Sequence, residues 1–402
     1  MRLPIPERIN GWVLTIGTIC GAGLMLVVSI WGQVSGEVCG FDAPPFTRVA
    51  AYASGGLIAG FAGAILGVGG AFIVVPFLVL VMGLSMHHAA AASIVGVLAV
   101  SSAAAPGNLK HGFSNVRLAM CMLLTSIIGV IIGGQLANVI EERYLGRILG
   151  LVLLFGAYSL WRRIRMRAEP MPHEDDLGNL GGRYFDPARK ELVTYHVKRL
   201  PATIGSSLSG GLTSSLLGIG GGTVNVPVMR LLTGVPMRAA ASTSIYIMGV
   251  TAASAAFVHF QDGNSAPLVI APLALGTLFG SLLGSRASRY IHGHFIQYIF
   301  VGLLVLIAGR MLLGDYSSDD PAKVGATLEC ISMQWYEVFA VILKGDASAL
   351  PALGLLILMF TPILGLISAM IVAGLRRDWR LALMALSVLL LVAVNLVIAT
   401  LL

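Results

Sequence analysis

The chain has 402 residues, of which 56% are hydrophobic and 11% are charged, and its mean hydropathy is +0.87. One water-soluble core of ordinary size cannot bury so much apolar surface, so the composition excludes a soluble globular protein and predicts an all-α membrane protein. The net charge of +7 does not indicate nucleic-acid binding, because the basic residues cluster in short segments between apolar runs, where they report membrane topology.

Residues 1–50 are expected to form an accessory transmembrane helix and an external loop. The apolar run at 13–30 approaches the length of about 20 residues that a spanning helix needs, and no small-residue cleavage site of a signal peptide follows it. We therefore expect this helix to be retained, with its N-terminus in the cytoplasm.

The region 51–314 contains a duplication. The motif Gly67-Val-Gly-Gly-Ala, followed by Pro76, recurs as Gly218-Ile-Gly-Gly-Gly, followed by Pro227. The register then holds without a gap through the pairs Gly83 and Gly234, Met86 and Met237, Ser93 and Ser244, Gly129 and Gly280, and Gly133 and Gly284. Compositional bias does not keep one register over such a length. Residues 51–161 and 200–314 are therefore expected to be two copies of one unit, joined by a charged cytoplasmic linker at 162–199.

Each copy begins with a segment that suits neither one membrane span nor two. Residues 52–83 number about 30, whereas one span takes about 20, and Gly67, Gly69 and Gly70 lie in their middle. Glycine permits tight turns, and irregular backbone at membrane depth is tolerated only where protein or a watery cavity surrounds it. The sequence therefore predicts a re-entrant helical hairpin followed by three transmembrane helices in each copy.

The distribution of charge favours this hairpin. With the N-terminus inside, a hairpin places Lys110, Arg117 and the arginine-rich linker at 162–199 in the cytoplasm, and it places Glu141 and Glu142 outside, as the positive-inside rule requires. A full span through each glycine segment would put the linker's arginines outside. The two repeats are therefore expected to have inverted topology.

The end of the chain, residues 315–402, is expected to contribute an external loop and two accessory transmembrane helices. Arg376, Arg377 and Arg380 lie between these helices and are expected inside. Together these expectations describe a multi-pass protein of the bacterial inner membrane, in contact with lipid. A homodimer is left open.

The glycine segments are also the candidate site. The second half of each hairpin begins directly after its glycines, so its free N–H groups and the positive end of its dipole point toward the centre of the membrane, where they suit an anion. Thr223 and Asn225 add side-chain donors in the second copy, and hydroxyls near the start of the following spans can reach the same cavity. The predicted substrate-binding residues are Gly67, Gly69, Gly70, Ser93, Gly218, Gly220, Gly221, Gly222, Thr223, Asn225, Ser242, Thr243 and Ser244.

These residues have alternative interpretations. Glycines in membrane helices commonly serve close helix packing, although two copies in register favour the turn. A membrane serine commonly bonds a carbonyl of the preceding turn. The amide of Asn225 lies in an otherwise apolar half-helix, where polar groups tend to face a cavity. Asn108 and His259 occupy matched positions at the far ends of the next spans. We expect them to line the pathway, with a solvated or structural role for His259 as the alternative.

The cysteines and the missing motifs narrow the function. Cys39 and Cys330 fall in segments predicted to be external, so a disulfide in an oxidising periplasm and two free thiols are the alternatives. No cysteine spacing suits a metal site, and no cofactor is expected. The lack of a GxxxxGK[ST] loop argues against a self-contained ATPase, and the lack of Asp or Glu deep in a predicted span argues against a carboxylate proton relay.

The paired motifs resemble those of the TauE/SafE family of sulfite and organosulfonate exporters. The likeness rests on GIGGG at 218–222 with Pro227, on GVGGAFIVVP at 67–76, and on Ala91-Ala92-Ser93 and Ser242-Thr243-Ser244, and it covers residues 52–313. It implies efflux of sulfite, sulfoacetate or a related organosulfonate, with the glycines of both turns and Asn225 at the site. The long linker and the helices added at both ends depart from the usual core and leave the substrate open.

The leading hypothesis is therefore a secondary transporter, and not an enzyme, that exports a small sulfur-containing anion. A neutral protein site with positive dipoles favours anions, and the inside-negative membrane potential drives them outward. Uptake of a sulfur oxyanion through the same fold is the first alternative. A membrane enzyme or assembly factor is the second, and it would require clustered His, Asp, Glu or Cys within the membrane, which the sequence lacks.

Overall fold

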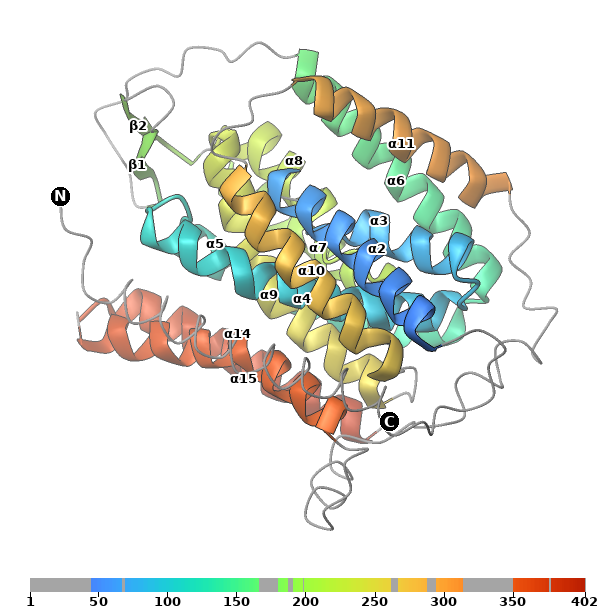
Figure 1. Cartoon of the computed structure of the whole chain (residues 1–402). Coiled ribbons are helices and arrows are strands. Elements are labelled where there is room, and N and C mark those ends of the chain that lie inside the picture. The colour runs from blue at the N-terminus through green and yellow to red at the C-terminus, as the bar shows by residue number, and fades with distance from the viewer. Residues whose placement is uncertain are drawn as a thin grey trace.

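In a computed structural model, the chain is described at residues 45–66, 69–165, 180–186, 191–197, 199–261, 267–287, 294–313, 350–375 and 377–401 (Figure 1). These residues are mostly helical, and seven of their helices are long and apolar enough to cross a membrane. The prediction of a helical membrane protein with several spans is thus confirmed. The expected N-terminal helix, Gly67, Cys39 and Cys330 lie outside the described residues.

The two copies contain corresponding helices in the same order. The first consists of α2 (Pro45–Leu66), α3 (Ala71–Pro76), the π-helix η1 (Phe77–Val81), α4 (Met86–Lys110), α5 (Val116–Val139) and α6 (Glu142–Arg165). The second consists of α7 (Leu200–Leu217), α8 (Gly222–Thr233), α9 (Met237–Gln261), α10 (Pro267–Ala287) and α11 (His294–Leu313). The matched helices α4 and α9 begin at Met86 and Met237, and each has 25 residues. The register of the duplication therefore extends to helix boundaries.

Two consecutive glycines turn the backbone in each copy. Gly69 and Gly70 have φ angles of 89° and 76°, and Gly220 and Gly221 have φ angles of 73° and 69°. Residues with a Cβ rarely enter this region, because the Cβ crowds the neighbouring backbone. Helices α2 and α7 therefore end at the glycines, and a new helix begins after each turn.

The helix after each turn runs back beside the helix before it. In the first copy, a Cβ added at Gly63 would lie 2.2 Å from the backbone of the turn, and one added at Gly55 would lie 2.3 Å from the ring of Phe77. In the second copy, a Cβ added at Gly210 would lie 2.3 Å from Oδ1 of Asn225. The two halves approach so closely because these positions of α2 and α7 carry no side chain.

The copies interlock through helix pairs that cross between them. In Figure 1, α2 packs on α10, α7 on α5, α4 on α9 and α6 on α11. A Cβ added at Gly280 would lie 2.1 Å from the carbonyl oxygen of Leu57, and one added at Gly129 would lie 2.2 Å from that of Leu208. Gly129 and Gly280 are matched residues, so both copies use the same position for close helix packing.

Helices α4 and α9 form the centre of the bundle. The most apolar stretches of these two helices are 89% and 94% buried. Ser114, in the loop after α4, donates its hydroxyl to the carbonyl of Ser242 at 3.1 Å, and Ser101, in the middle of α4, donates to the carbonyl of Ile245 at 2.7 Å. The end of α4 thus lies beside the start of α9, and the two helices run in opposite directions.

The linker contains a β-hairpin that the sequence analysis did not predict. Its strands are β1 (Gly182–Asp186) and β2 (Glu191–Tyr195), which pair antiparallel. Tyr184 packs edge-on against Phe113, with 5.7 Å between ring centroids, and Nδ2 of Asn115 donates to the hydroxyl of Tyr195 at 3.3 Å. Burial raises the pKa of the Tyr195 phenol, and the bond from Asn115 opposes this rise. The hairpin therefore packs onto the loop between α4 and α5.

The two C-terminal helices pack against the same core. They are α14 (Leu350–Leu375) and α15 (Trp379–Leu401), and they contact α4, α5 and α9. Nδ2 of Asn395 donates to the carbonyl of Ser254 at 2.9 Å. In the loop between the helices, Oδ2 of Asp378 lies 2.7 Å from Nη2 of Arg117, and this bond lowers the pKa of the Asp378 carboxyl.

Candidate functional site

The two glycine turns meet on the side chain of Val97, in the middle of α4. A Cβ added at Gly220 would lie 2.6 Å from Cγ1 of Val97, and one added at Gly69 would lie 3.7 Å from the same atom. Met248, the residue of α9 that matches Val97, has its sulfur 2.9 Å from the Cβ position of Gly69. The structure therefore brings predicted glycines of both copies to one buried point.

A helix starts beside this point in each copy. Gly221 is the N-cap of α8 and Gly70 is the N-cap of α3, and neither start has a side-chain cap. In α8, the N–H groups of Val224 and Asn225 donate to the carbonyl of Gly221 at 3.2 and 2.9 Å. The N–H groups before them have no acceptor within the helix, and the helix dipole adds partial positive charge. The centre of the bundle therefore suits a negative group.

Ser93 and Ser244 contribute buried hydroxyls. Both residues are 0% exposed, and neither hydroxyl has a hydrogen-bond partner among the described residues. Neither therefore bonds a carbonyl of the preceding turn, which was the alternative role for a membrane serine. Ser93 lies about one helical turn from Val97 and from Ala90, whose Cα is 2.6 Å from the Cβ position of Gly218. It thus belongs to the face of α4 that meets the second turn.

Thr223 and Asn225, the two residues of α8 predicted to add side-chain donors, have different surroundings. Thr223 and Asn225 are 6% and 1% exposed, and neither the hydroxyl of Thr223 nor Oδ1 of Asn225 has a partner within the described part of the chain. Asn225 packs against Gly210 inside the α7–α8 hairpin, whereas Thr223 lines a pocket. The two residues predicted to act together therefore face different spaces.

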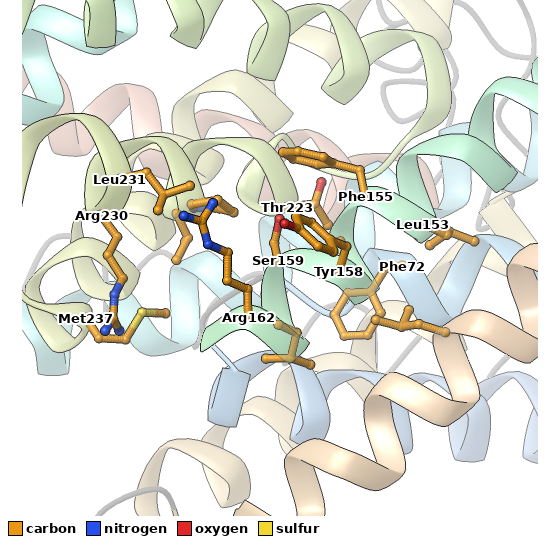
Figure 2. A pocket seen from close by; sticks show the side chains of 15 residues that line it. Phe72, Leu153, Phe155, Tyr158, Ser159, Arg162, Thr223, Arg230, Leu231 and Met237 are labelled. Atoms are coloured by element: carbon orange, nitrogen blue, oxygen red, sulfur yellow. The ribbon is translucent and has the colours of Figure 1, made fainter. Parts of the chain in front are cut away.

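The pocket lies beside α8 (Figure 2). Residues of α6, α8 and α11 line it together with Phe72 and Met237, and its volume is about 150 Å³. One water needs roughly 10–15 Å³ of such space, so the pocket has room for a ligand of several heavy atoms. Its polar lining includes Thr223, Ser159, Arg162 and Arg230, whereas most of the wall is apolar.

Ser242 and Thr243 hold the loop after α4. The hydroxyl oxygen of Thr243 accepts a hydrogen bond from the N–H of Asn115 at 2.9 Å, and the carbonyl of Ser242 accepts one from Ser114. The hydroxyl of the neighbouring Ser244, in contrast to that of Thr243, has no hydrogen-bond partner among the residues described.

Asn108 and His259 have different surroundings. Asn108 is half-buried in the last turn of α4, and its carbonyl accepts a bond from the N–H of Phe113 at 3.0 Å. His259 is 2% exposed, and its Nε2 lies 2.9 Å from the carbonyl oxygen of Ser215 in α7. These contacts tie His259 to helix packing, and a pathway role for either residue stays a prediction.

Sequence reasoning missed three residues of the pocket. Arg162 and Arg230 were interpreted as topology signals alone, and Phe72 was not singled out. A signal was available for Phe72, because it occupies the position in the first copy that Thr223 occupies in the second. Comparing the copies residue by residue would have marked this difference between an aromatic ring and a hydroxyl.

A duplicated bundle of apolar helices with two broken, glycine-centred segments defines a multi-pass membrane transporter. Residues 52–311 match the sequence profile described as "Sulfite exporter TauE/SafE", and the chain belongs to this family. The resemblance drawn from the paired motifs is thus confirmed.

Similar proteins carry transporter names. The chain is 24% identical over 266 residues to the "Probable membrane transporter protein YunE" of Bacillus subtilis, a match that covers 64% of this chain and 94% of that protein. It is 27% identical over 260 residues to a "Probable membrane transporter protein" of Xylella fastidiosa, covering 63% of this chain and 90% of the relative. MamO of Magnetospirillum gryphiswaldense, also named a probable membrane transporter protein, is 25% identical over 276 residues, which are 64% of this chain and 43% of MamO. No solved structure matches the chain.

Proposed function

We propose that the protein is a secondary transporter that exports a small sulfur-containing anion, such as sulfite, sulfoacetate or a related organosulfonate, across the bacterial inner membrane. The observation that carries this proposal is the meeting of both glycine turns on Val97, each followed by an uncapped helix start. Helix starts bind anions without a fixed charge, so the anion can also leave. The hydroxyls of Ser93 and Ser244 supply further donors.

The architecture we propose for this transport is a pair of inverted repeats with re-entrant hairpins. Two contacts support the hairpins, because Gly55 approaches Phe77 and Gly210 approaches Asn225 across each turn. The opposite directions of the matched helices α4 and α9 support the inversion. In such folds the site between the repeats stays fixed while each side opens in turn.

Contacts between segments support the proposed orientation. Segments predicted to be cytoplasmic lie together: Arg117 pairs with Asp378, and the guanidinium of Arg238 lies 5.2 Å from the centre of the Phe113 ring, on which the linker hairpin also packs. Nδ1 of His87 lies 3.1 Å from Oε1 of Glu142, which was predicted to be external. Arg117 and Arg238 both belong to the segments predicted to be cytoplasmic, as the positive-inside rule requires.

The membrane potential gives the proposed direction. Each elementary charge that crosses an inside-negative potential changes the free energy by about 2.3 kcal/mol per 100 mV. An anion that moves without a coupled cation is therefore driven outward by the membrane potential, and its export needs no other energy source. Uptake would need a coupled cation.

Counterflow in proteoliposomes tests the proposal. Vesicles loaded with unlabelled sulfite, sulfoacetate or sulfate would take up the same labelled anion from outside, and we expect counterflow with sulfite or sulfoacetate at least. If net movement into the vesicles requires an inward gradient of protons or sodium, this would favour uptake by coupling. No counterflow with any of these anions, from a folded and inserted protein, would contradict both directions of transport.

A further inference from the structure

The pocket beside α8 connects one surface of the bundle to the start of that helix. Figure 2 shows Arg230, Leu231 and Met237 at one end and Phe72 and Leu153 at the other, with Thr223 between them. On α8, Thr223 and Arg230 are seven residues apart, so they share one face and are separated by about 10 Å along the helix axis. The pocket therefore follows one face of α8 for two turns.

Both arginines of the pocket lie at its linker end. Arg162 is in the last turn of α6, where the linker begins, and Arg230 is near the end of α8, which packs against α7. Within the described part of the chain, neither guanidinium has a carboxylate partner within ion-pair distance, and no acidic residue lines the pocket. Two positive charges at one mouth raise the local concentration of anions.

The inner part of the pocket offers one polar group at a helix start. Thr223 lines the pocket one residue after the first residue of α8, and its buried hydroxyl lacks a partner among the described residues. The rest of the wall there consists mainly of apolar side chains such as Phe72, Leu153 and Val226. A fully hydrated inorganic dianion would lose most of its water against such a wall, whereas an apolar substituent would gain by being buried.

We propose that this pocket is the cytoplasmic entrance of the transport path and that it selects amphipathic organic anions, of which alkanesulfonates are the chemical type. The acid group passes from Arg162 and Arg230 to the hydroxyl of Thr223 and the start of α8, while the apolar substituent packs against α6 and Phe72. This inference rests on the proposed transport function and names its substrate class.

The first copy lacks a counterpart of this entrance. The residues that match Arg162, Arg230 and Thr223 there are Leu313, Val79 and Phe72. Phe72 is 2% exposed and packs edge-on against Phe300, with 6.3 Å between ring centroids. The polar groups of this entrance therefore belong to the second copy, and the matched positions of the first copy carry apolar side chains.

Binding of a homologous series tests the entrance. We would titrate ethane-, butane- and hexanesulfonate into the full chain in phosphatidylcholine nanodiscs by calorimetry, with empty nanodiscs as the blank. Affinity should rise by about fourfold for each methylene that is buried. Sulfite should bind more weakly than butanesulfonate. Equal affinity for sulfite and for all three sulfonates would overturn the proposal.

Variants place the binding in this pocket. Arg230→Gln and Thr223→Val should each weaken butanesulfonate by about tenfold, because each removes a donor to the charged group. Thr223→Ser should bind as the unchanged protein does. Arg286→Gln is the matched control, since Arg286 is an exposed arginine of α10 outside the pocket, and it should leave the affinity unchanged. An equal loss in Arg286→Gln, or no loss in both pocket variants, would overturn the proposal.

Three further outcomes separate this inference from others. If phosphatidylglycerol in the nanodisc abolishes sulfonate binding and the sulfonates show no counterflow, the pocket holds a lipid headgroup and the proposal fails. If sulfite counterflow is normal in Arg230→Gln and Thr223→Val, the transport function stands and this entrance is wrong. If the sulfonates bind as expected but no anion is transported, the site stands as a binding pocket and the transport function fails.

Discussion

Asn225 and Gly221 carry the sharpest prediction at the scale of single residues. Asn225→Leu removes a buried amide from α8, and an anion that loses one such bond should bind about ten- to a hundredfold more weakly. Gly221→Val adds a Cβ at a φ of 69°, 2.4 Å from the carbonyl oxygen of Gly210. We expect both variants to lose anion flux in proteoliposomes, and Gly221→Val should in addition lower the melting temperature, because its side chain meets backbone at a positive φ.

Val74 supplies the control, because it is the residue of the first copy that matches Asn225. Val74→Leu should reduce flux less than Asn225→Leu, since it removes no polar group. Normal flux in Asn225→Leu together with loss of flux in Val74→Leu would mean that the polar wall belongs to the other hairpin.

The buried hydroxyls divide into two groups with opposite expectations. Ser93→Ala and Ser244→Ala remove hydroxyls that have no partner among the described residues, so they should change thermal stability little but lower flux. Thr243→Val removes the acceptor of the Asn115 N–H, so it should destabilise the protein by about 1–3 kcal/mol. Measuring both thermal unfolding in detergent and anion flux for each variant distinguishes the two groups. Unaltered flux in both serine variants would show that Ser93 and Ser244 do not belong to the site.

At the scale of elements, the glycines of α10 and α11 provide a matched pair. Gly280→Ala would place a Cβ 2.1 Å from the carbonyl oxygen of Leu57 and should force α2 and α10 apart. Gly309→Ala, on α11, meets nothing within 4 Å among the described residues and should be neutral or slightly stabilising, as alanine favours helix. Equal melting temperatures for the two variants would contradict the packing of α2 on α10.

The sequence allowed most elements to be predicted, because the signals were long or repeated. Apolar runs marked α4, α5 and α15, and the second copy of the glycine motif marked both helix breaks. The hairpin of β1 and β2 was missed because its strands are five residues each and lie in a charged linker. Its contacts are tertiary, through Tyr184 and Tyr195, and short strands carry little periodic signal.

The site was harder to predict than the fold. The motif directed attention to both turns, which meet at Val97, yet sequence spacing could not tell that Thr223 and Asn225 face different spaces. Sequence spacing also could not tell that the hydroxyl oxygen of Thr243 accepts a hydrogen bond from the N–H of Asn115, whereas the hydroxyl of Ser244 has no partner among the described residues. Which face of a helix meets a cavity depends on neighbouring helices, and a single sequence does not contain those contacts.

At the scale of the whole molecule, orientation in the membrane gives a direct prediction. A cysteine at Glu191, in the linker hairpin of a chain whose own four cysteines are replaced, should resist an impermeant thiol reagent added to intact cells. A cysteine at Glu141 should react. The reverse pattern would contradict the positive-inside assignment and, with it, the inverted repeats. The pairing of Cys39 with Cys330 stays a prediction, for which mass spectrometry without reduction is the test.

Anion flux under an imposed potential tests the central claim most directly. Proteoliposomes loaded with labelled sulfite or butanesulfonate would receive a potassium diffusion potential, negative inside, set with valinomycin. We predict efflux that accelerates as the potential becomes more negative and that is lost in Gly221→Val. Efflux that ignores the potential, or no efflux of either anion from the inserted protein, would contradict the claim that the two glycine turns form the site of an anion exporter.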